Sequence, residues 1–397
     1  MSKAQTSDRV SNFTESVIRE MTRIAIQAGA VNLAQGYPDF AAPDVVKEAA
    51  VRAIRADANQ YSITWGTLSL RTAIAESYRR RFNLNIDPQT DIAVCCGATE
   101  CMLAALLATT NPGDEVILFE PFYENYRPDA WMCGAIPRLV PLRAPTISSD
   151  GTGSSRWHFD PDELAAAFGP KTRAIIITSP HNPTGHVFSR EELETIAALC
   201  IKHDVLAITD EIYEHITYDE HAHVPMATLP GMAERTITIS GLSKTFSITG
   251  WRLGYCFAPA SIATAIRKVH DFMTVNAPTP LQEAGAVALT LGADYYSGLK
   301  AEYRRKRDIL LAALRQKGFK PSVPEGAYYI MADYSELSAE DDTEFAMRMV
   351  REAGLASVPG SSFYWHKSLS RTMIRFCYCK KDETLHQAAH CLAGWDV

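Results

Sequence analysis

No stretch of this sequence is apolar for long enough to cross a membrane. Among its 397 residues, every apolar run is shorter than the roughly 18 residues that a spanning helix needs. The N-terminus also lacks the basic and then apolar pattern of a secretory signal peptide. We therefore expect no membrane partner and a cytoplasmic location.

Charge of one sign is not in excess either. The chain has 39 Lys and Arg against 46 Asp and Glu, which gives a formal net charge of −7, and no long run carries one sign. Proteins that bind nucleic acids usually present clustered basic residues. We therefore expect no nucleic-acid partner, although small anions can still bind locally.

Metal-ligand spacing is also missing. The nine cysteines form no C-x-x-C pair and do not stand at zinc-like spacing, so we interpret them as structural thiols. His215, His221 and His223 lie in a polar segment, where we expect solvated surface rather than metal ligands. The sequence thus predicts no metal site.

What the sequence does contain is a regular order of helical and strand-like segments. Helical spacing of apolar residues occurs at 11–29, 44–56, 67–82, 99–110, 122–132, 190–203, 261–271, 300–316 and 342–353. Runs typical of strands occur at 92–96, 115–120, 173–178, 205–209, 235–240, 254–258, 326–330 and 372–378. Their alternation after residue 92 predicts an α/β fold, with a mostly parallel sheet covered by helices on both faces. Ligands of such sheets bind at the carboxyl ends of the strands.

Lys244 is the first candidate for chemistry. It lies among small and apolar residues between Ser240 and Gly254, and Arg252 follows it by eight positions. A lysine whose pKa is lowered by its surroundings can form a Schiff base with a carbonyl cofactor, while an arginine binds a phosphate. Because a lysine near a glycine-rich turn is by itself usually a surface residue, this interpretation needs support from other motifs.

Two strand ends upstream provide such support. Gly97, Ala98 and Thr99 end one strand and begin a helix, where N–H groups and the threonine hydroxyl can bind a phosphate. A simple N-terminal cap is an equally good interpretation of that threonine. Tyr123 follows the next strand, where its ring either covers a flat ligand or packs in the core.

Two further strand ends carry polar side chains. Asn182 lies between prolines in the turn from Ser179 to Gly185, which either aims its amide at a ligand or is simply structural. Asp210 ends an apolar strand, and a buried carboxylate needs a cationic partner, such as a protonated pyridine nitrogen. Tyr213, three residues later, would reach the adjacent ring hydroxyl.

The motifs described so far occur together with Gln35 to Phe40 (QGYPDF) and with Arg375 in the segment IRF. Taken in this order, they resemble class I aminotransferases of pyridoxal-phosphate fold type I. The resemblance covers nearly the whole chain and is strongest to the aspartate, kynurenine and methionine aminotransferases. It implies a large domain at 46–286, with a mostly parallel seven-stranded sheet between helices. It also implies a smaller α+β domain built from residues 1–45 and 287–397.

The resemblance implies pyridoxal 5'-phosphate as the cofactor. Lys244 would hold it as a Schiff base and move protons, and Asp210 would keep its ring nitrogen protonated. Tyr213 and Asn182 would bind the ring's phenolic oxygen, and Tyr123 would stack on the ring. The residues implied for the phosphate are Gly97, Ala98, Thr99, Arg252 and either Ser243 or Ser240.

The resemblance also implies how substrates bind. Arg375 would form a planar pair with the α-carboxylate, helped by Gly36 and Asn182. Tyr61 matches a tyrosine that reaches the partner's phosphate, which implies a homodimer with active sites at the subunit interface. Tyr37, Trp65 and Asn276 are the residues expected around a small polar or acidic side chain. No second arginine can be assigned to such a side chain, and Arg23 and Arg138 remain open.

The sequence therefore predicts an aminotransferase with a ping-pong mechanism. Its donor would be an L-amino acid, with aspartate as the first choice and aromatic amino acids or methionine next, and its acceptor a 2-oxo acid such as 2-oxoglutarate. One alternative is a carbon–sulfur β-lyase acting on cysteine conjugates with the same lysine and cofactor. A remote alternative is a regulator that binds the cofactor without catalysis.

Overall fold

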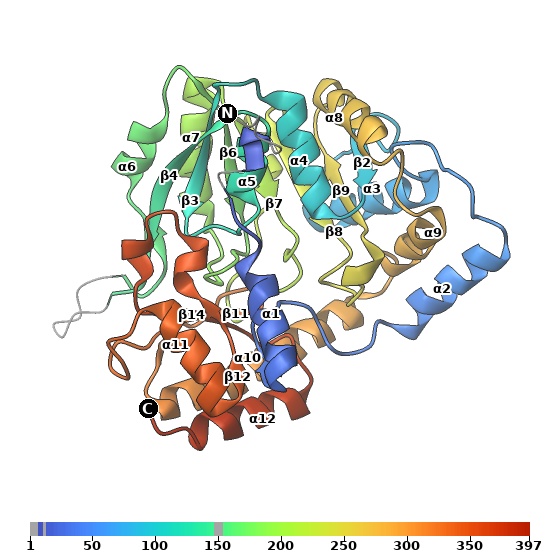
Figure 1. Cartoon of the computed structure of the whole chain (residues 1–397). Coiled ribbons are helices and arrows are strands. Elements are labelled where there is room, and N and C mark those ends of the chain that lie inside the picture. The colour runs from blue at the N-terminus through green and yellow to red at the C-terminus, as the bar shows by residue number, and fades with distance from the viewer. Residues whose placement is uncertain (1–6, 11–12, 147–153) are drawn as a thin grey trace, which may run out of the picture.

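A computed structural model of the chain describes residues 7–10, 13–146 and 154–397 (Figure 1). Its main sheet has eight strands in the described residues, in the order β2-β9-β8-β7-β6-β3-β4-β5. These strands are β2 (Ile92–Cys95), β3 (Glu115–Glu120), β4 (Ile136–Arg143), β5 (His158–Phe159), β6 (Thr172–Thr178), β7 (Leu206–Asp210), β8 (Thr236–Gly241) and β9 (Gly254–Phe257). The neighbouring strands β8, β7, β6, β3 and β4 are parallel, whereas β9 runs antiparallel to both of its neighbours and β5 runs antiparallel to β4.

The mostly parallel sheet is therefore confirmed, and β5 adds two residues to the edge beyond the seven long strands. The sequence patterns had indicated six of those seven and missed β4. That strand alternates between exposed and buried residues and contains Pro137 and Pro141. It thus lacks the continuous apolar run that reveals a strand buried on both faces.

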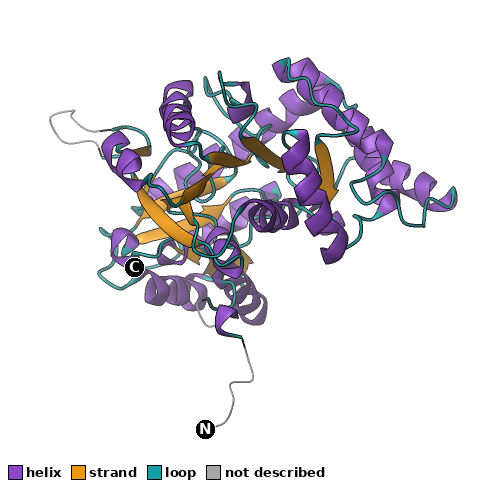
Figure 2. Ribbon diagram, turned by 90° about the horizontal axis from the view of Figure 1, so that it is seen from above, coloured by secondary structure: helices purple, strands orange, loops and turns teal. Residues whose placement is uncertain are grey.

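Helices cover both faces of this sheet (Figures 1 and 2). They are α4 (Ala98–Thr109), α5 (Tyr126–Met132), α6 (Pro161–Ala167), α7 (Arg190–His203) and α8 (Ala260–Met273). Along β3, Val116 and Leu118 pack with α4, α5 and α8, while Ile117 and Phe119 pack with α6 and α7. Successive side chains of a strand point to opposite faces, so this apolar strand contributes to two cores.

The N-terminal third adds α1 (Val17–Ala28), α2 (Asp44–Arg55) and α3 (Leu68–Phe82), and α9 (Thr279–Ala288) packs against α2 and α3. α1 starts at Val17. Ser16, the residue before it, caps the helix because its side chain accepts a hydrogen bond from the N–H of Arg19. Residues 11 and 12 of the helix predicted at 11–29 lie outside the described residues, as do 1–6 of the predicted small domain. No described helix is long and apolar enough to cross a membrane.

The C-terminal part forms a second, antiparallel sheet in the order β10-β11-β14-β13. Its elements are α10 (Ala293–Lys317), β10 (Lys320–Pro321), β11 (Tyr329–Asp333), α11 (Asp342–Arg348), the π-helix η4 (Met349–Ala353), β12 (Leu355–Ala356), β13 (Val358–Pro359), β14 (Met373–Cys377) and α12 (Asp382–Ala393). Short 3-10 helices lie at Asp8–Val10, Met226–Thr228, Thr249–Trp251, Gly360–Phe363 and Lys367–Ser370.

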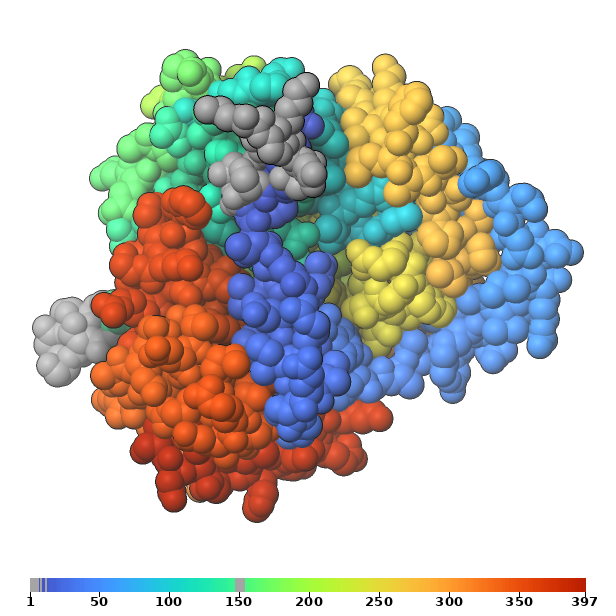
Figure 3. Space-filling view, viewed as in Figure 1, coloured from blue at the N-terminus to red at the C-terminus, as the bar shows by residue number. Residues whose placement is uncertain are grey.

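The N-terminal segment joins this C-terminal part. β1 (Val31–Asn32) pairs in parallel with β12, and residues of α1 share a core cluster with α10, α11 and α12. In Figure 3, α1 lies on the surface between the C-terminal part and the rest of the chain. The division into domains at 46–286 remains a prediction, and this shared core is the observation that favours it.

Candidate active site

One cavity of about 410 Å³ lies at the carboxyl ends of the strands. Twelve of the residues singled out in the sequence line it: Gly36, Tyr37, Ala98, Thr99, Tyr123, Asn182, Asp210, Tyr213, Ser243, Lys244, Arg252 and Arg375. They come from separate strand ends, the N-terminal segment and β14. The alternating fold therefore gathers distant parts of the sequence at one edge of the sheet.

Lys244 follows β8 and points into the cavity. Its Nζ donates a hydrogen bond to the carbonyl oxygen of Gly36 at 3.1 Å, and the rings of Tyr213 and Tyr328 flank it at 6.0 and 5.8 Å. Burial lowers the pKa of this amine to about 8, and nearby Arg252 adds to the effect. A substantial fraction is therefore uncharged near neutral pH, and only the uncharged amine is a nucleophile.

Asp210 is the last residue of β7 and is buried. Tyr126 donates a hydrogen bond from its hydroxyl to Oδ2 at 2.6 Å, and the N–H of Ile212 donates to Oδ1 at 3.2 Å. Burial raises the pKa of Asp210, while these two hydrogen bonds and the charge of Lys244 oppose the rise. The carboxylate is thus held in place by donors but has no ion-pair partner among the described residues.

Arg375 is fully buried on β14. Its Nη1 donates to Oδ1 of Asn182 at 2.9 Å and its Nη2 to the carbonyl of Ala34 at 2.7 Å. The rings of Tyr329 and Phe363 lie 4.4 and 4.5 Å from the guanidinium. Nε has no hydrogen-bond partner within the described part of the chain. A rigid, desolvated guanidinium with spare donor capacity suits a planar carboxylate.

Tyr213 shares a hydrogen bond with another tyrosine. Its hydroxyl lies 2.9 Å from that of Tyr329, and a Cβ added to Gly36 would lie only 2.2 Å from the same Tyr329 oxygen. The chain therefore needs glycine at position 36 for the N-terminal segment to approach this tyrosine pair.

The start of α4 and Arg252 form a compact cationic corner. Arg252 donates to the carbonyls of Thr249 and Cys96 at 3.1 and 3.4 Å. Gly97 has a φ of 92°, and a Cβ there would lie 2.3 Å from Nη2 of Arg252. The first N–H groups of a helix have no partner inside that helix, so this corner presents donors and positive charge to an anion.

The structure separates the two serines proposed for the phosphate. Ser243 lines the cavity, but Ser240 donates its hydroxyl to Oε1 of Glu214 at 2.8 Å. Ser240 lies within β8 and is fully buried. Its hydroxyl therefore binds Glu214 and does not line the cavity. This geometry favours Ser243 over Ser240 for the phosphate, and that role stays a prediction.

Besides Gly97 and Ser240, three predicted residues do not line the cavity. The Tyr61 side chain is 78% exposed, and the Trp65 ring lies 4.9 Å from the guanidinium of Arg267. Asn276 donates to the carbonyl of Ala277 at 2.7 Å. Their roles in binding cofactor or substrate therefore stay predictions.

Sequence reasoning missed other residues of the site. Tyr126 and Tyr329 bond to Asp210 and Tyr213, and Arg19 also lines the cavity. Tyr126 lay inside a predicted helix and Tyr329 inside a predicted strand, where a tyrosine is more often core. The only signal for Arg19 was a place on the exposed side of a predicted amphipathic helix.

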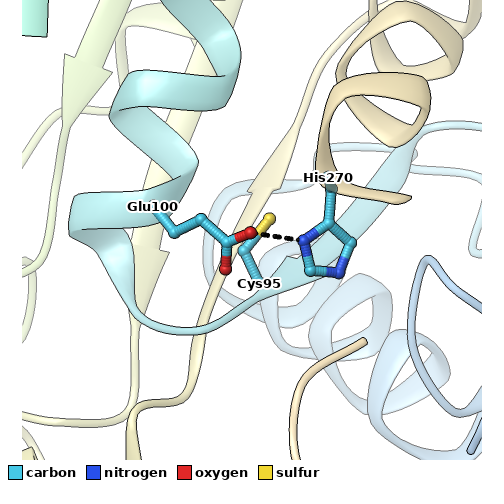
Figure 4. A group of neighbouring side chains, drawn as sticks. All are labelled: Cys95, Glu100 and His270. Carbon is cyan, nitrogen blue, oxygen red and sulfur yellow. Dashed lines mark hydrogen bonds and ion pairs between the residues drawn. The ribbon is translucent and has the colours of Figure 1, made fainter. Parts of the chain in front are cut away.

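Beneath the start of α4, the fold brings together Cys95, Glu100 and His270 (Figure 4). Their ligand atoms lie within 4.8 Å of one another, which spacing in the sequence did not reveal. Nδ1 of His270 lies 2.7 Å from Oε1 of Glu100, which also accepts from Thr274 at 2.7 Å. Since the other carboxylate oxygen accepts from the N–H of Cys96, the group is explained as an ion pair that anchors the helix start.

The histidines at 215 to 223 also differ from expectation. His215 and His223 are buried rather than solvated. Nε2 of His223 lies 2.8 Å from Oε2 of the buried Glu211, and the ring of His215 stacks on Tyr296 at 4.4 Å. The segment packs against α3 and α10, so its polar groups find partners inside the protein.

Comparison with known proteins gives consistent results. The family model described as aminotransferase class I and II matches residues 28–392. The chain is 40% identical to a kynurenine–oxoglutarate transaminase of Dictyostelium discoideum, over 96% of this chain and 94% of that protein.

Solved structures agree with this match. N-succinyldiaminopimelate aminotransferase from Mycobacterium tuberculosis superposes with a TM-score of 0.93 at 39% identity, covering 98% of this chain and 99% of the other. A protein from Escherichia coli with a methionine aminotransferase function gives a TM-score of 0.91 at 35% identity, again covering 98% and 99%.

Proposed function

The chain belongs to the class I and II aminotransferases, and on that premise we propose which of its residues act and on what. Its fold is that of the fold type I enzymes, and its cofactor is pyridoxal 5'-phosphate. We propose that it passes the amino group of an L-amino acid to 2-oxoglutarate, with aspartate as the first donor to test. The observation that carries this proposal is the presence of Lys244 and Arg375 in one cavity.

The residues of the cavity fit the cofactor. A buried carboxylate, Asp210, has no ion-pair partner among the described residues, and the Arg252 guanidinium can pack against the start of α4 because position 97 lacks a Cβ. The positive charge and the N–H groups there suit a phosphate. The bound cofactor supplies an electron sink for the negative charge that develops at the substrate Cα.

Each residue then has a definite task. Asp210 holds a proton on the ring nitrogen through its negative charge, which Tyr126 stabilises by its hydrogen bond. Tyr213 and Asn182 would bind the phenolic oxygen, and Tyr123 would cover the ring. Arg252, Ser243 and the N–H groups at the start of α4 would hold the phosphate.

Lys244 and Arg375 act on the substrate. Arg375 orients it by pairing with the α-carboxylate, for which its guanidinium is already rigid between two rings. Lys244, whose lowered pKa lets its Nζ both accept and give a proton near neutral pH, moves a proton at the substrate Cα. Because the amine is enclosed, little water competes for this proton.

We also propose a homodimer. Phe272, in the last turn of α8, is 93% exposed, and Tyr61, in the segment between α2 and α3, is 78% exposed; Ile63, Met273 and Val275 beside them in the sequence are also exposed. The hydroxyl of Thr64 donates to Asp271 of α8 at 3.0 Å, which places the segment of Tyr61 beside the end of that helix. A contiguous apolar patch of this kind favours a protein partner, and a second copy would bring Tyr61 to the partner's phosphate.

The visible absorption spectrum of the cofactor-loaded protein tests the reaction. We expect aspartate alone to replace the cofactor's visible band with that of its aminated form, and 2-oxoglutarate to restore it. Phenylalanine, kynurenine, methionine and N-succinyldiaminopimelate are tested next. Release of pyruvate and ammonia from a cysteine conjugate without an acceptor would indicate the β-lyase, and a band unchanged by every donor would contradict transamination.

A further inference from the structure

Four cationic side chains of the described residues line the cavity: Arg19, Lys244, Arg252 and Arg375. The proposed function, on which this inference rests, gives a task to three of them. Lys244 and Arg375 meet the substrate's reacting end, and Arg252 meets the phosphate. Arg19 has none.

Arg19 belongs to the first turn of α1, which lies on the surface beside the C-terminal part (Figure 3). Its side chain borders the cavity together with Gln35, Tyr37 and Tyr123. Burial raises the pKa of Tyr123 to about 12, and the charge of Arg19 opposes that rise. The guanidinium is therefore within electrostatic reach of the ring that covers the cofactor.

Among the described residues, no carboxylate pairs with the guanidinium of Arg19. In the described ranges its side chain forms no ion pair, and the carboxylate of Glu124, which shares the cavity, accepts a hydrogen bond from Ser16 instead. The two arginines that the sequence analysis left open for a side-chain carboxylate are already paired. Arg23 binds Glu15, and Arg138 binds Glu115 at 2.6 Å.

A substrate has three groups around Cα that the site must place. Its α-carboxylate goes to Arg375 and its amino group to Lys244, so the side chain extends along the remaining walls of the cavity. Those walls include Tyr37, Tyr123 and Arg19. We infer that Arg19 binds the second carboxylate of dicarboxylic substrates, which makes it the residue that selects 2-oxoglutarate and an acidic amino donor over neutral ones.

Steady-state kinetics of Arg19→Gln and Arg19→Lys test this inference. The acceptors are 2-oxoglutarate and 2-oxopentanoate, which have the same chain length but differ in the second carboxylate. A hydrogen-bonded charge pair contributes enough for about a 10- to 100-fold loss of kcat/KM when it is removed. We expect that loss for Arg19→Gln with 2-oxoglutarate, no comparable loss with 2-oxopentanoate, and partial rescue by Arg19→Lys.

Arg23→Gln is the matched control, since it removes a charge one turn further along α1 and outside the cavity. It should leave both acceptors unaffected. Equal losses with the two acceptors in Arg19→Gln, or no loss with either, would overturn the inference.

Failure of the proposed function is distinguishable from failure of this inference. If the wild type transaminates no donor, calorimetry of the cofactor-loaded protein with glutarate and with pentanoate still tests Arg19. Loss of glutarate binding in Arg19→Gln but not in Arg23→Gln supports its role, whereas equal binding by all three proteins refutes it.

Discussion

Removing the hydroxyl of Tyr126 should make Asp210 a weaker partner for the cofactor. Tyr126 donates to Oδ2 of Asp210 at 2.6 Å, and Thr178 donates in turn to the Tyr126 oxygen at 2.7 Å. Burial already raises the pKa of Asp210, and the hydrogen bond from Tyr126 is the largest of the effects that lower it. In Tyr126→Phe the pKa must therefore rise further.

The size of the shift follows from the strength of the hydrogen bond. A hydrogen bond to a charged group contributes about 1.5–3 kcal/mol, and one pKa unit corresponds to about 1.4 kcal/mol. The pKa of Asp210 should thus rise by about 1–2 units. Activity that needs the ionised carboxylate should then be lost at a correspondingly higher pH.

The assay is the pH dependence of kcat/KM for wild type and Tyr126→Phe, from about pH 5 to about pH 9. The acidic limb should move upward by about one unit or more, with a smaller change at the plateau. Tyr78→Phe is the matched control, because Tyr78 is a buried tyrosine that donates to Glu214 at 3.0 Å, outside the cavity. An unchanged acidic limb in Tyr126→Phe, or an equal movement in Tyr78→Phe, would refute the reasoning.

Three further predictions follow from single residues. Lys244 should control the rate at which the apoenzyme binds its cofactor, with a midpoint near pH 8 rather than 10.5 in stopped-flow measurements. Gly97→Ala should weaken cofactor affinity at least about tenfold, as measured by equilibrium dialysis. Gly113→Ala should not, since it has a similar φ of 90° but open space around it. Burial opposes protonation of His270, but hydrogen bonds with Cys95 and Glu100 raise its pKa to about 10. Its stabilising effect is therefore complete below about pH 6.5 and lost as the pH approaches 10, so thermal unfolding of His270→Asn should depend less on pH over that range.

From the sequence, we could predict which strand ends carry the candidate site residues better than which contacts their side chains make. Lys244, Asp210 and Asn182 follow apolar strands, and the carboxyl ends of parallel strands meet at one edge, so their proximity followed from the order of elements. The choice between Ser240 and Ser243 could not be predicted in this way. Ser240 lies within β8 and donates to the buried Glu214, and the order of elements reveals neither the direction of its side chain nor this partner.

Contacts between residues that are far apart in the sequence could not be predicted either. Glu100 and His270 are 170 positions apart, and no spacing rule connects them. The same holds for Tyr213 and Tyr329, which are 116 positions apart and whose contact joins the segment after β7 to β11 of the other sheet. Where the pairing partner comes from another sheet, periodicity identifies the element but not the contact.

Lys244, the proposed reactive amine, and Arg375, the arginine proposed to bind the carboxylate, are both positioned by neutral oxygens. Lys244 donates to the carbonyl of Gly36, and Arg375 donates to the carbonyl of Ala34 and the amide of Asn182. A carboxylate in these places would form a bond about twice as strong, and it would raise the pKa of Lys244 and cancel the charge of Arg375. Carbonyl and amide acceptors fix the geometry without either effect. The cavity therefore keeps an amine that can lose its proton and a positive charge that a substrate carboxylate can still neutralise.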